Sequence, residues 1–367
     1  MSDNAFIKGM DVSTLLEEEA CGARYYDHGV EMDLFDILQN YGVNSVRLRL
    51  WNDPYDEDGK PYGAGTNDLE KTIILAKRAK VHQMTWLLDF HYSDFWADPG
   101  KQTVPKAWRG LDVAGLEKAV YDYTVEVMQR LRQEDILPDM VQVGNELTNG
   151  LLWPTGRKPE YDNLARYINA GIRGVRAVDA KIPIMIHLDN GGLNEMYVDW
   201  FEHFMERGEP FEIIGLSYYP FWHGTMDQLE FNMRDMARRY GKQLVIAEVS
   251  MGFTMEDYRD REKLPKDQLK GMATRPELVE KIPYPMSRQG QADFMQDILA
   301  RIRAVPGGAG FYYWEPGWIP VPGCGWATEE ALLYTGEKGP GGNEWANQAL
   351  FDYDGNALPA LEVIRDF

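Results

Sequence analysis

Two glutamates stand at the ends of short apolar runs that resemble each other. Glu146 closes residues 141–146 (VQVGNE), and Glu248 closes residues 243–248 (QLVIAE). An apolar, β-branched run that ends in a carboxylate predicts a buried strand whose last side chain reaches the open end of a sheet. Glycosidic bonds are hydrolysed by two carboxyl groups that flank the bond. We therefore interpret Glu146 as the acid/base and Glu248 as the nucleophile of such a reaction.

Each glutamate could instead be only a capping or ion-paired residue. Two of them in matching contexts, 102 residues apart (248 − 146), favour a shared cleft over two unrelated structural roles. Asn145 directly precedes Glu146 and is placed to hydrogen-bond a sugar hydroxyl, a contact that can strengthen in the transition state.

Two arginines share one face of another apolar run. Arg47 and Arg49 alternate with the aliphatic residues of 46–50, so both are expected to point into the same interior, where a charge must be paired. Arg49 is nearer the open end, and we expect it to contact a catalytic carboxylate and keep it ionised. Arg47 is interpreted as a structural ion-pair partner.

Further polar and aromatic residues end the other runs. Asp89 and His91 share a face, and His91 is expected to be a hydrogen-bonding wall residue rather than a metal ligand. Trp314 could form the floor under a sugar ring, because C–H groups pack on aromatic faces. The remaining candidates at run ends are His187, Asp189, Tyr218, Tyr219 and Glu315.

A metal-dependent hydrolase is the main alternative chemistry, because His91, His187 and His223 all fall near run ends. The sequence contains no His-x-His pair and no HExxH run. A serine nucleophile is disfavoured as well, since no G-x-S-x-G is present. We expect no metal at the site and no cofactor.

Eight apolar runs alternate with helical or loop segments, which predicts an α/β fold with a parallel sheet. Eight such units close a (β/α)₈ TIM barrel. An open doubly wound sheet is the alternative, but residues 13–16 (STLL) after the first run are not a glycine-rich phosphate loop. The predicted strands are residues 6–12, 45–51, 85–91, 140–146, 182–189, 212–219, 244–248 and 310–315.

Helical periodicity and capping residues predict helices over residues 32–41, 68–80, 116–131 and 161–178. No linker or low-complexity tract divides the chain, so residues 1–367 are expected to form a single catalytic domain. Long connections over residues 250–287 and 316–348 follow strands 7 and 8 of the predicted barrel. Long loops in an ordered barrel are often functional, and these would project from the active-site face.

Composition limits the kinds of partner. With 38 Lys and Arg against 58 Asp and Glu, the net charge of −20 disfavours nucleic acid and polyanionic polymers and favours a neutral substrate. No run approaches the roughly 18 uncharged apolar residues of a membrane helix. We expect a monomer with no membrane partner, in which Cys21 and Cys324 are two separate thiols.

The start of the chain, MSDNAFIKG, lacks the apolar core of a signal peptide. The protein is therefore expected to be cytoplasmic if Met1 is the native start, and otherwise secreted with its leader removed.

Several motifs extend along nearly the whole chain. They are residues 9–13 (GMDVS), 44–52 (NSVRLRLWN), 89–99 (DFHYSDFWADP), 143–146 (VGNE), 152–154 (LWP), 217–220 (SYYP), 222–224 (WHG), 311–316 (FYYWEP) and 348–352 (QALFD). In these motifs the chain resembles glycoside hydrolase family 53, the arabinogalactan endo-β-1,4-galactanases, within the clan of retaining (β/α)₈ glycosidases.

The resemblance implies cleavage of internal β-1,4 links in galactan, a side chain of pectic polysaccharide, with retention at the anomeric centre. It implies Glu146 as acid/base and Glu248 as nucleophile. The sugar-contacting positions that it implies are Arg49, His91, Asn145, Tyr218 and Trp314, with Trp96 further along the cleft, and Asp189 is included among the substrate-binding candidates. A β-glucanase or β-mannanase of the same clan, and a non-catalytic galactan-binding barrel, are the alternatives.

Bacterial relatives often carry calcium in the loop after the seventh strand. The corresponding residues 255–263 (MEDYRDREK) contain arginines and no glycine. Glycine permits the tight turn around such an ion, and neighbouring cations oppose its binding. Calcium is therefore not expected here.

Overall fold

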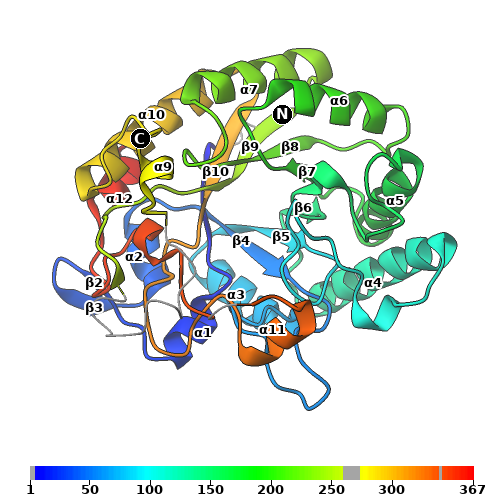
Figure 1. Cartoon of the computed structure of the whole chain (residues 1–367), viewed down its shortest axis with the longest axis horizontal. Helices are drawn as coiled ribbons and strands as arrows, with labels where there is room; N and C mark the ends of the chain where they lie inside the picture. Colours follow the sequence, from blue (N-terminus) through cyan, green and yellow to red (C-terminus); the bar gives the residue numbers. More distant parts are fainter. Residues whose placement is uncertain (1–4, 259–272, 339–340) are drawn as a thin grey trace.

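The computed structural model describes residues 5–258, 273–338 and 341–367 (Figure 1). Its centre is a closed barrel of eight parallel strands, in which β1 pairs with both β10 and β4. The barrel strands are β1 (Ile7–Asp11), β4 (Ser45–Leu50), β5 (Thr85–Phe90), β6 (Met140–Val143), β7 (Ile184–Leu188), β8 (Ile213–Tyr218), β9 (Gln243–Val249) and β10 (Gly308–Trp314). The predicted (β/α)₈ barrel is confirmed.

Helices surround the strands on the outside of the barrel (Figure 1). The longer ones are α3 (Leu69–Val81), α4 (Val113–Gln133), α5 (Tyr161–Val178), α6 (Asn194–Met205), α7 (Met226–Tyr240) and α10 (Arg288–Ala304). The shorter ones are α1 (Leu15–Ala20), α2 (Leu34–Asn40), α9 (Pro276–Val279), α11 (Glu329–Thr335) and α12 (Pro359–Asp366). A small hairpin of β2 (Tyr25–Asp27) and β3 (Val30–Met32) lies outside the barrel and was not predicted.

Side-chain caps fix where several of these helices begin. The Asp68 carboxylate accepts a hydrogen bond from the Lys71 amide at the start of α3, as the sequence predicted. Thr225 and Gln228 form a reciprocal capping box at the start of α7. Such caps satisfy backbone donors that have no partner within the helix. Within the described residues no helix is long and apolar enough to cross a membrane.

The barrel interior has an apolar lower part and a polar upper part. The lower part is a separate buried cluster formed by Leu87, Met185, Ile213, Val245, Ala247 and Tyr312. Toward the carboxyl ends of the strands the interior holds Arg47, Asp89 and Gln142, all fully buried. Charged groups persist in an interior only when they are paired, so this upper layer must be organised around ion pairs.

One irregularity in β9 affects the site directly. Leu216 of β8 pairs with Ile246, but Ser217 pairs with Glu248, so β9 carries an extra residue at this point. Val245 and Ala247 both belong to the interior cluster, and strict alternation would therefore point Glu248 outward. The β-bulge turns Glu248 back toward the barrel mouth.

Candidate active site

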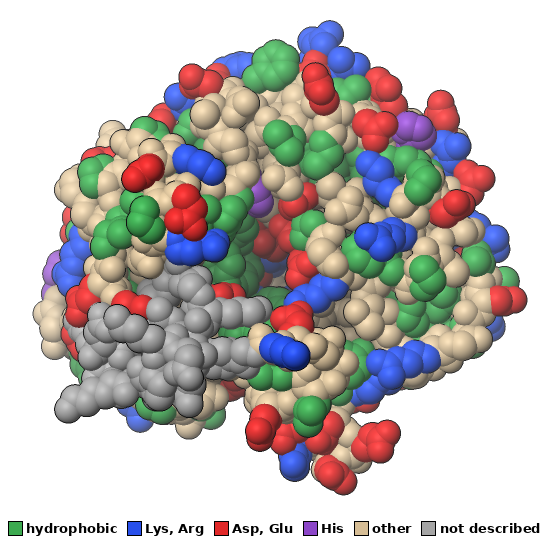
Figure 2. All heavy atoms as spheres, viewed as in Figure 1, with side chains coloured by type: hydrophobic (Ala, Val, Ile, Leu, Met, Phe, Trp, Pro, Cys, Tyr) green, Lys and Arg blue, Asp and Glu red, His purple; other side chains and the backbone are tan. Residues whose placement is uncertain are grey.

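A cleft of about 320 Å³ opens at the carboxyl ends of the barrel strands. Figure 2 shows a hollow in the middle of this face, with acidic and apolar side chains in its wall. The predicted residues that line the cleft are Glu146, Glu248, Arg49, His91, Trp96, Asn145, Asp189 and Trp314. The structure thus brings together all of the predicted catalytic and substrate-binding residues except Tyr218, while the further candidates His187 and Glu315 lie outside the cleft lining.

The two glutamates face each other in this cleft. A carboxylate oxygen of Glu146 and one of Glu248 lie within 4.8 Å of each other. A separation of about 5–5.5 Å is typical of retaining glycosidases, whereas inverting enzymes hold the carboxyl groups about 6.5–9.5 Å apart. The spacing fits direct attack by one carboxylate better than activation of a water held between the two.

Glu146 lies beyond the strand that was expected to end with it. Strand β6 ends at Val143, and Gly144 and Glu146 both adopt left-handed backbone conformations, with φ of 82° and 47°. The predicted strand end at residue 146 is therefore wrong by three residues. A non-glycine residue in this conformation costs about 1–2 kcal/mol, and such strain concentrates at functional sites. The turn aims the Glu146 side chain into the cleft.

Glu248 is held as a carboxylate by two donors. Arg47 Nη2 lies 3.0 Å from its Oε1, and the Tyr219 hydroxyl donates to its Oε2 at 2.8 Å. Burial raises the pKa of Glu248 above its usual value, and the Arg47 charge and the Tyr219 hydrogen bond oppose this rise. These two contacts favour the ionised form, which a nucleophile requires.

Glu146 has the opposite environment. Its Oε1 accepts a hydrogen bond from the Ser217 hydroxyl at 2.6 Å, and no cation contacts it among the described residues. Burial raises the pKa of Glu146 well above its usual range, and the negative charges of Glu248 and Asp189 raise it further. Glu146 is therefore suited to hold a proton and to donate it.

Arg47 is the structural ion-pair partner that the sequence predicted, but Arg47 rather than Arg49 also contacts one of the two cleft glutamates. Arg47 contacts Glu248 and also pairs with Asp11 and Asp89 at 2.8 Å each. Arg49 instead pairs with Glu315 at 2.6 Å. The prediction overlooked side-chain length: Arg47 starts deeper in the barrel, but its long side chain extends upward to the catalytic layer.

Arg49 still lines the cleft, over an aromatic wall. Its guanidinium carbon lies 4.5 Å from the centre of the Trp96 ring and 5.6 Å from that of Trp314. Burial raises the pKa of its partner Glu315 to about 7, against the opposing effect of Arg49.

Tyr218 does not line the cleft, so its prediction as a substrate-binding residue is wrong. Its side chain points away from the cleft, its hydroxyl donates to the Gly224 carbonyl at 3.0 Å, and its ring stacks on Phe294 of α10. Tyr219 lines the cleft instead and binds Glu248. Successive strand side chains alternate between faces, so Ser217 faces the interior and Tyr218 faces the helices.

Buried hydrogen bonds fix the remaining polar residues. His91 Nε2 lies 3.0 Å from Asp89 Oδ2, and the Trp51 indole donates to His91 Nδ1 at 3.0 Å. These contacts agree with the expected role of His91 as a hydrogen-bonding wall residue. The Asn145 amide accepts from Arg47 and donates to the Ala97 carbonyl, at 2.9 Å each.

Asp189 lies on the Glu146 side of the cleft. Its two carboxylate oxygens accept hydrogen bonds from Thr148 and Asn190. Burial raises the pKa of Asp189 to about 6, because it outweighs those two hydrogen bonds.

Indole rings form much of the cleft wall. Trp314 packs edge-on against Trp345 with ring centroids 4.7 Å apart, and Trp96 lies 6.0 Å from Trp314. Trp222, at 44% exposure, packs against Trp345 at one end. Aromatic faces of this kind bind sugar rings through C–H contacts.

Among the described residues, two clusters of side chains could supply ligand atoms to a metal ion. One of them, in the cleft, consists of Glu146, His187 and Glu248. His187 Nε2 already contacts the Ser217 hydroxyl at 2.8 Å, and its Nδ1 contacts Asn145 Oδ1 at 2.9 Å. A neutral imidazole has one N–H and one lone pair, and the Gln142 side-chain amide, 3.1 Å from Nδ1, can donate to that lone pair. This group fits a hydrogen-bond relay rather than a metal centre.

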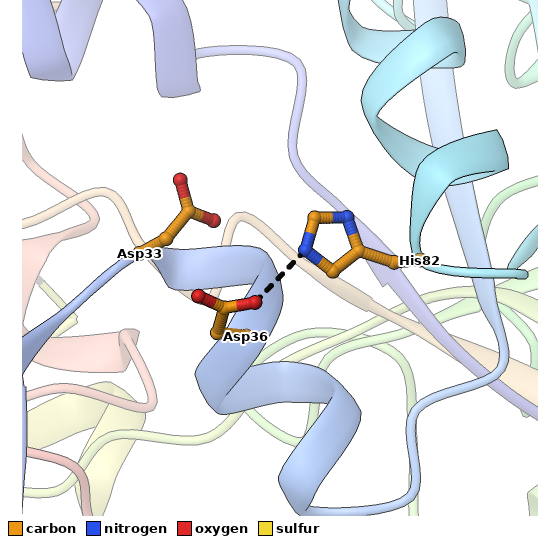
Figure 3. A group of neighbouring side chains, drawn as sticks. All are labelled: Asp33, Asp36 and His82. Carbon is orange, nitrogen blue, oxygen red and sulfur yellow. Dashed lines mark hydrogen bonds and ion pairs between the residues drawn. The ribbon is translucent and has the colours of Figure 1, made fainter.

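The other group is on the outside of the barrel, where Asp33 and Asp36 of the α2 region face His82 at the end of α3 (Figure 3). Asp33 caps α2 through the Phe35 amide and pairs with Arg78 at 2.7 Å. His82 Nε2 lies 3.1 Å from Asp36. Capping and ion pairing account for all three side chains.

The long connections contribute unequally to the cleft within the described residues. Trp326, Glu344 and Trp345 from residues 316–348 line it, whereas no described residue of 250–287 does. In the calcium-loop stretch 255–263, residues 259–263 lie outside the described residues. The expectation that this loop holds no calcium therefore stays a prediction.

Sequence reasoning missed several residues of the cleft or its support: Arg47 as the partner of Glu248, and Ser217, Trp222, Trp326 and Trp345. Tyr219 is a candidate at a run end, but Tyr218 rather than Tyr219 is the predicted substrate-binding residue. Side chains alternate between the two faces of a strand, so Tyr218 and Tyr219 must point in opposite directions. This alternation could have shown that only one of the two tyrosines enters the cleft. No local signal marks Trp345, because it reaches the cleft through a long irregular connection.

The chain matches known proteins along almost its entire length. Residues 7–364 match the model of Glycosyl hydrolase family 53. The endo-beta-1,4-galactanase of Bacillus subtilis (strain 168) is 38% identical over 380 residues, which cover 98% of this chain and 85% of that protein.

Two solved structures are similar in fold and sequence. The GH53 catalytic domain of Ignisphaera aggregans superposes with a TM-score of 0.89 at 41% identity, covering 98% of this chain and 95% of that one. A fungal beta-1,4-galactanase superposes with a TM-score of 0.79 at 33% identity, covering 99% of this chain and 100% of the other.

Proposed function

The chain belongs to glycosyl hydrolase family 53, and on that premise we propose that it cleaves internal β-1,4-galactosidic bonds of galactan and arabinogalactan with retention. The observation that supports this most directly is the pair of carboxylates within 4.8 Å, with an ionised environment for Glu248 and a protonated one for Glu146.

The reaction has two steps. In the first, Glu248 attacks the anomeric carbon while Glu146 gives its proton to the leaving glycosidic oxygen. The covalent galactosyl–Glu248 ester that results is then hydrolysed by water, which Glu146, now a carboxylate, activates as a base. Attack from opposite faces in the two steps returns the original β configuration.

The neighbours of the two glutamates support this division of roles. Arg47 and Tyr219 orient Glu248 and stabilise its charge before attack. The Ser217 hydroxyl can donate to the Glu146 carboxylate once it has lost its proton. All of these groups come from one chain, so we propose that the monomer is the active form, that the substrate is a neutral galactan, and that no metal or cofactor takes part in bond cleavage.

Linear galactan, carboxymethyl-cellulose and mannan, incubated separately with the enzyme, test the proposal. We expect reducing ends from galactan alone, a rapid fall in viscosity that indicates internal cleavage, and initial products with the β anomer by NMR. Initial α products would contradict retention, and faster cleavage of cellulose or mannan would reassign the substrate.

The Glu248→Ala variant identifies the nucleophile. Its turnover of galactan is expected to fall by on the order of 10⁴-fold or more, with an unchanged circular dichroism spectrum and partial rescue by azide, which can occupy the vacated space. Near-normal activity in this variant would refute the assignment.

A further inference from the structure

A second cavity of about 270 Å³ adjoins the catalytic cleft. Its wall includes Lys101, Gln102, Thr103, Arg109 and Trp153, and Lys101 also lines the catalytic cleft. The two cavities are therefore neighbours along one face of the barrel.

This cavity is connected to the acid/base side of the site by hydrogen bonds. The Trp153 amide donates to the Gln102 carbonyl at 2.8 Å, and the Gln102 side chain donates to the Asn145 carbonyl at 2.8 Å. Asn145 directly precedes Glu146. The connections after β5 and β6 supply these residues, and β5 lies opposite β9, the strand of Glu248, in the barrel order. A sugar here would lie on the side where Glu146 protonates the leaving group.

The cavity also has an excess of positive charge. Arg109 is exposed, and Arg157, also exposed, lies with its guanidinium carbon 4.2 Å from the centre of the Trp153 ring. Within the described part of the chain, neither arginine has an acidic partner within ion-pairing distance. Lys101 differs, because Glu337 at 2.6 Å and Asp98 at 3.6 Å offset its charge.

Arg109 lines the cavity together with Trp153 and lies 5.4 Å from the centre of the Tyr334 ring, while Arg157 packs on the Trp153 ring from outside the cavity wall. Two guanidinium groups with no acidic partner among the described residues are unexpected on a protein with a net charge of −20. Guanidinium groups bind carboxylates through paired hydrogen bonds, and the indole can pack against sugar C–H groups. We propose that Arg109, Trp153 and Arg157, here called the cationic rim site, bind a carboxylate-bearing sugar residue on the leaving-group side of the galactan chain. This inference rests on the proposed function and extends its substrate to galactans that carry an acidic residue toward the reducing end.

Two end-modified series of β-1,4-galacto-oligosaccharides, tetraose to octaose, test the site. Mild oxidation of the reducing end gives a terminal aldonate, and borohydride reduction gives a neutral alditol of the same length. Both ends are open-chain, so the two series differ in charge at one position. At low ionic strength, kcat/KM for the best aldonate is expected to exceed that for its alditol by about fivefold, the value of one partly exposed ion pair.

In the Arg109→Gln/Arg157→Gln double variant the ratio should fall to about one, and high salt should have the same effect on the wild type because it screens exposed charges. The matched control is Arg24→Gln/Arg365→Gln, which removes the same charge from residues outside both cavities and should keep the wild-type ratio.

A wild-type ratio of one at every chain length would overturn the inference, as would a ratio that survives in the Arg109/Arg157 double variant or collapses equally in the control. If neither series is cleaved, the proposed function itself is wrong and the inference falls with it. Cleavage of the alditols with no preference for the aldonates would refute only the cationic rim site.

Discussion

Glu146 and Glu248 are the same residue type in one cleft, yet their neighbours differ. Arg47 and Tyr219 oppose the rise that burial causes in the pKa of Glu248, whereas no described cation lies beside Glu146, whose pKa is raised well above its usual range. The proposed mechanism requires Glu248 ionised and Glu146 protonated. The value of kcat/KM should therefore fall as pH decreases through the pKa of Glu248 and fall again as pH increases through the raised pKa of Glu146. Two substitutions should shift the acidic and alkaline limbs of this kcat/KM profile separately.

Tyr219→Phe removes a hydrogen bond that lowers the pKa of Glu248. The pKa should rise, so the acidic limb of the kcat/KM profile should move to higher pH. Loss of a hydrogen bond to a charged group should also lower kcat/KM by about 10- to 100-fold. Tyr218→Phe is the matched control, because among the described residues that hydroxyl hydrogen-bonds only the Gly224 carbonyl, outside the cleft. Equal effects in the two variants would contradict the role of Tyr219.

Ser217→Ala should act on the alkaline limb of the kcat/KM profile, which depends on the pKa of Glu146. The Ser217 hydrogen bond lowers the pKa of Glu146, so its removal should raise that pKa and keep the acid protonated to higher pH. The alkaline limb of the profile should shift upward, while kcat/KM at the optimum falls by about tenfold or less. A shift of the acidic limb alone would show that Ser217 does not act through Glu146.

At the scale of the elements, Arg47 joins several strands. It extends from β4 and reaches Asp11 on β1, Asp89 on β5 and Glu248 on β9. One buried cation thus holds three acidic groups in the upper layer of the barrel, and the apolar cluster beneath them needs no such pairing. The catalytic layer is consequently sensitive to this one residue.

Arg47→Met should destabilise the fold by roughly 3–5 kcal/mol, because it leaves the buried Asp89 and Glu248 carboxylates without an arginine partner, whereas Asp11 keeps Arg49 at 3.3 Å. Chemical denaturation monitored by fluorescence measures the loss. Arg78→Met is a suitable control: it also breaks pairs to two acids, Glu19 and Asp33, but at the partly exposed surface, where we expect a loss of about 1 kcal/mol or less. Similar losses in the two variants would contradict a special role for Arg47.

At the scale of the whole molecule, the closed barrel brings the loops after its strands together around one cleft. Residues from positions as far apart as Arg49 and Trp345 line the same cleft. The site uses carboxylates, a guanidinium group and indoles, and the ring nitrogens of His187 are engaged in hydrogen bonds.

Exhaustive dialysis against a strong chelator should therefore leave the galactan-cleaving activity within about twofold of the untreated enzyme, less than the effect of one hydrogen bond. The melting temperature, recorded on the same samples, distinguishes a structural ion from a catalytic one. A large loss of activity that added Ca²⁺ or Zn²⁺ restores would contradict metal-independent cleavage.

The sequence alone determined the barrel and placed two carboxylates, Glu146 and Glu248, near its open end. Alternation of eight apolar runs with helical segments fixes a parallel eight-stranded sheet, and Glu146 and Glu248 could be identified because each follows a strongly apolar run. Both features are patterns within short stretches of sequence, because the residues of a buried strand are chosen by strand propensity and by burial.

Only the tertiary structure decided how the side chains are oriented. The bulge in β9 turns Glu248 inward, and the left-handed turn after β6 aims Glu146 at it. Arg47 rather than Arg49 contacts Glu248, because how far a side chain reaches along the barrel axis depends on its packing. Tyr219 rather than Tyr218 enters the cleft, because the register between β8 and β9 sets which face of β8 is interior. Pairing between strands distant in sequence determines these choices, so no short stretch of sequence records them.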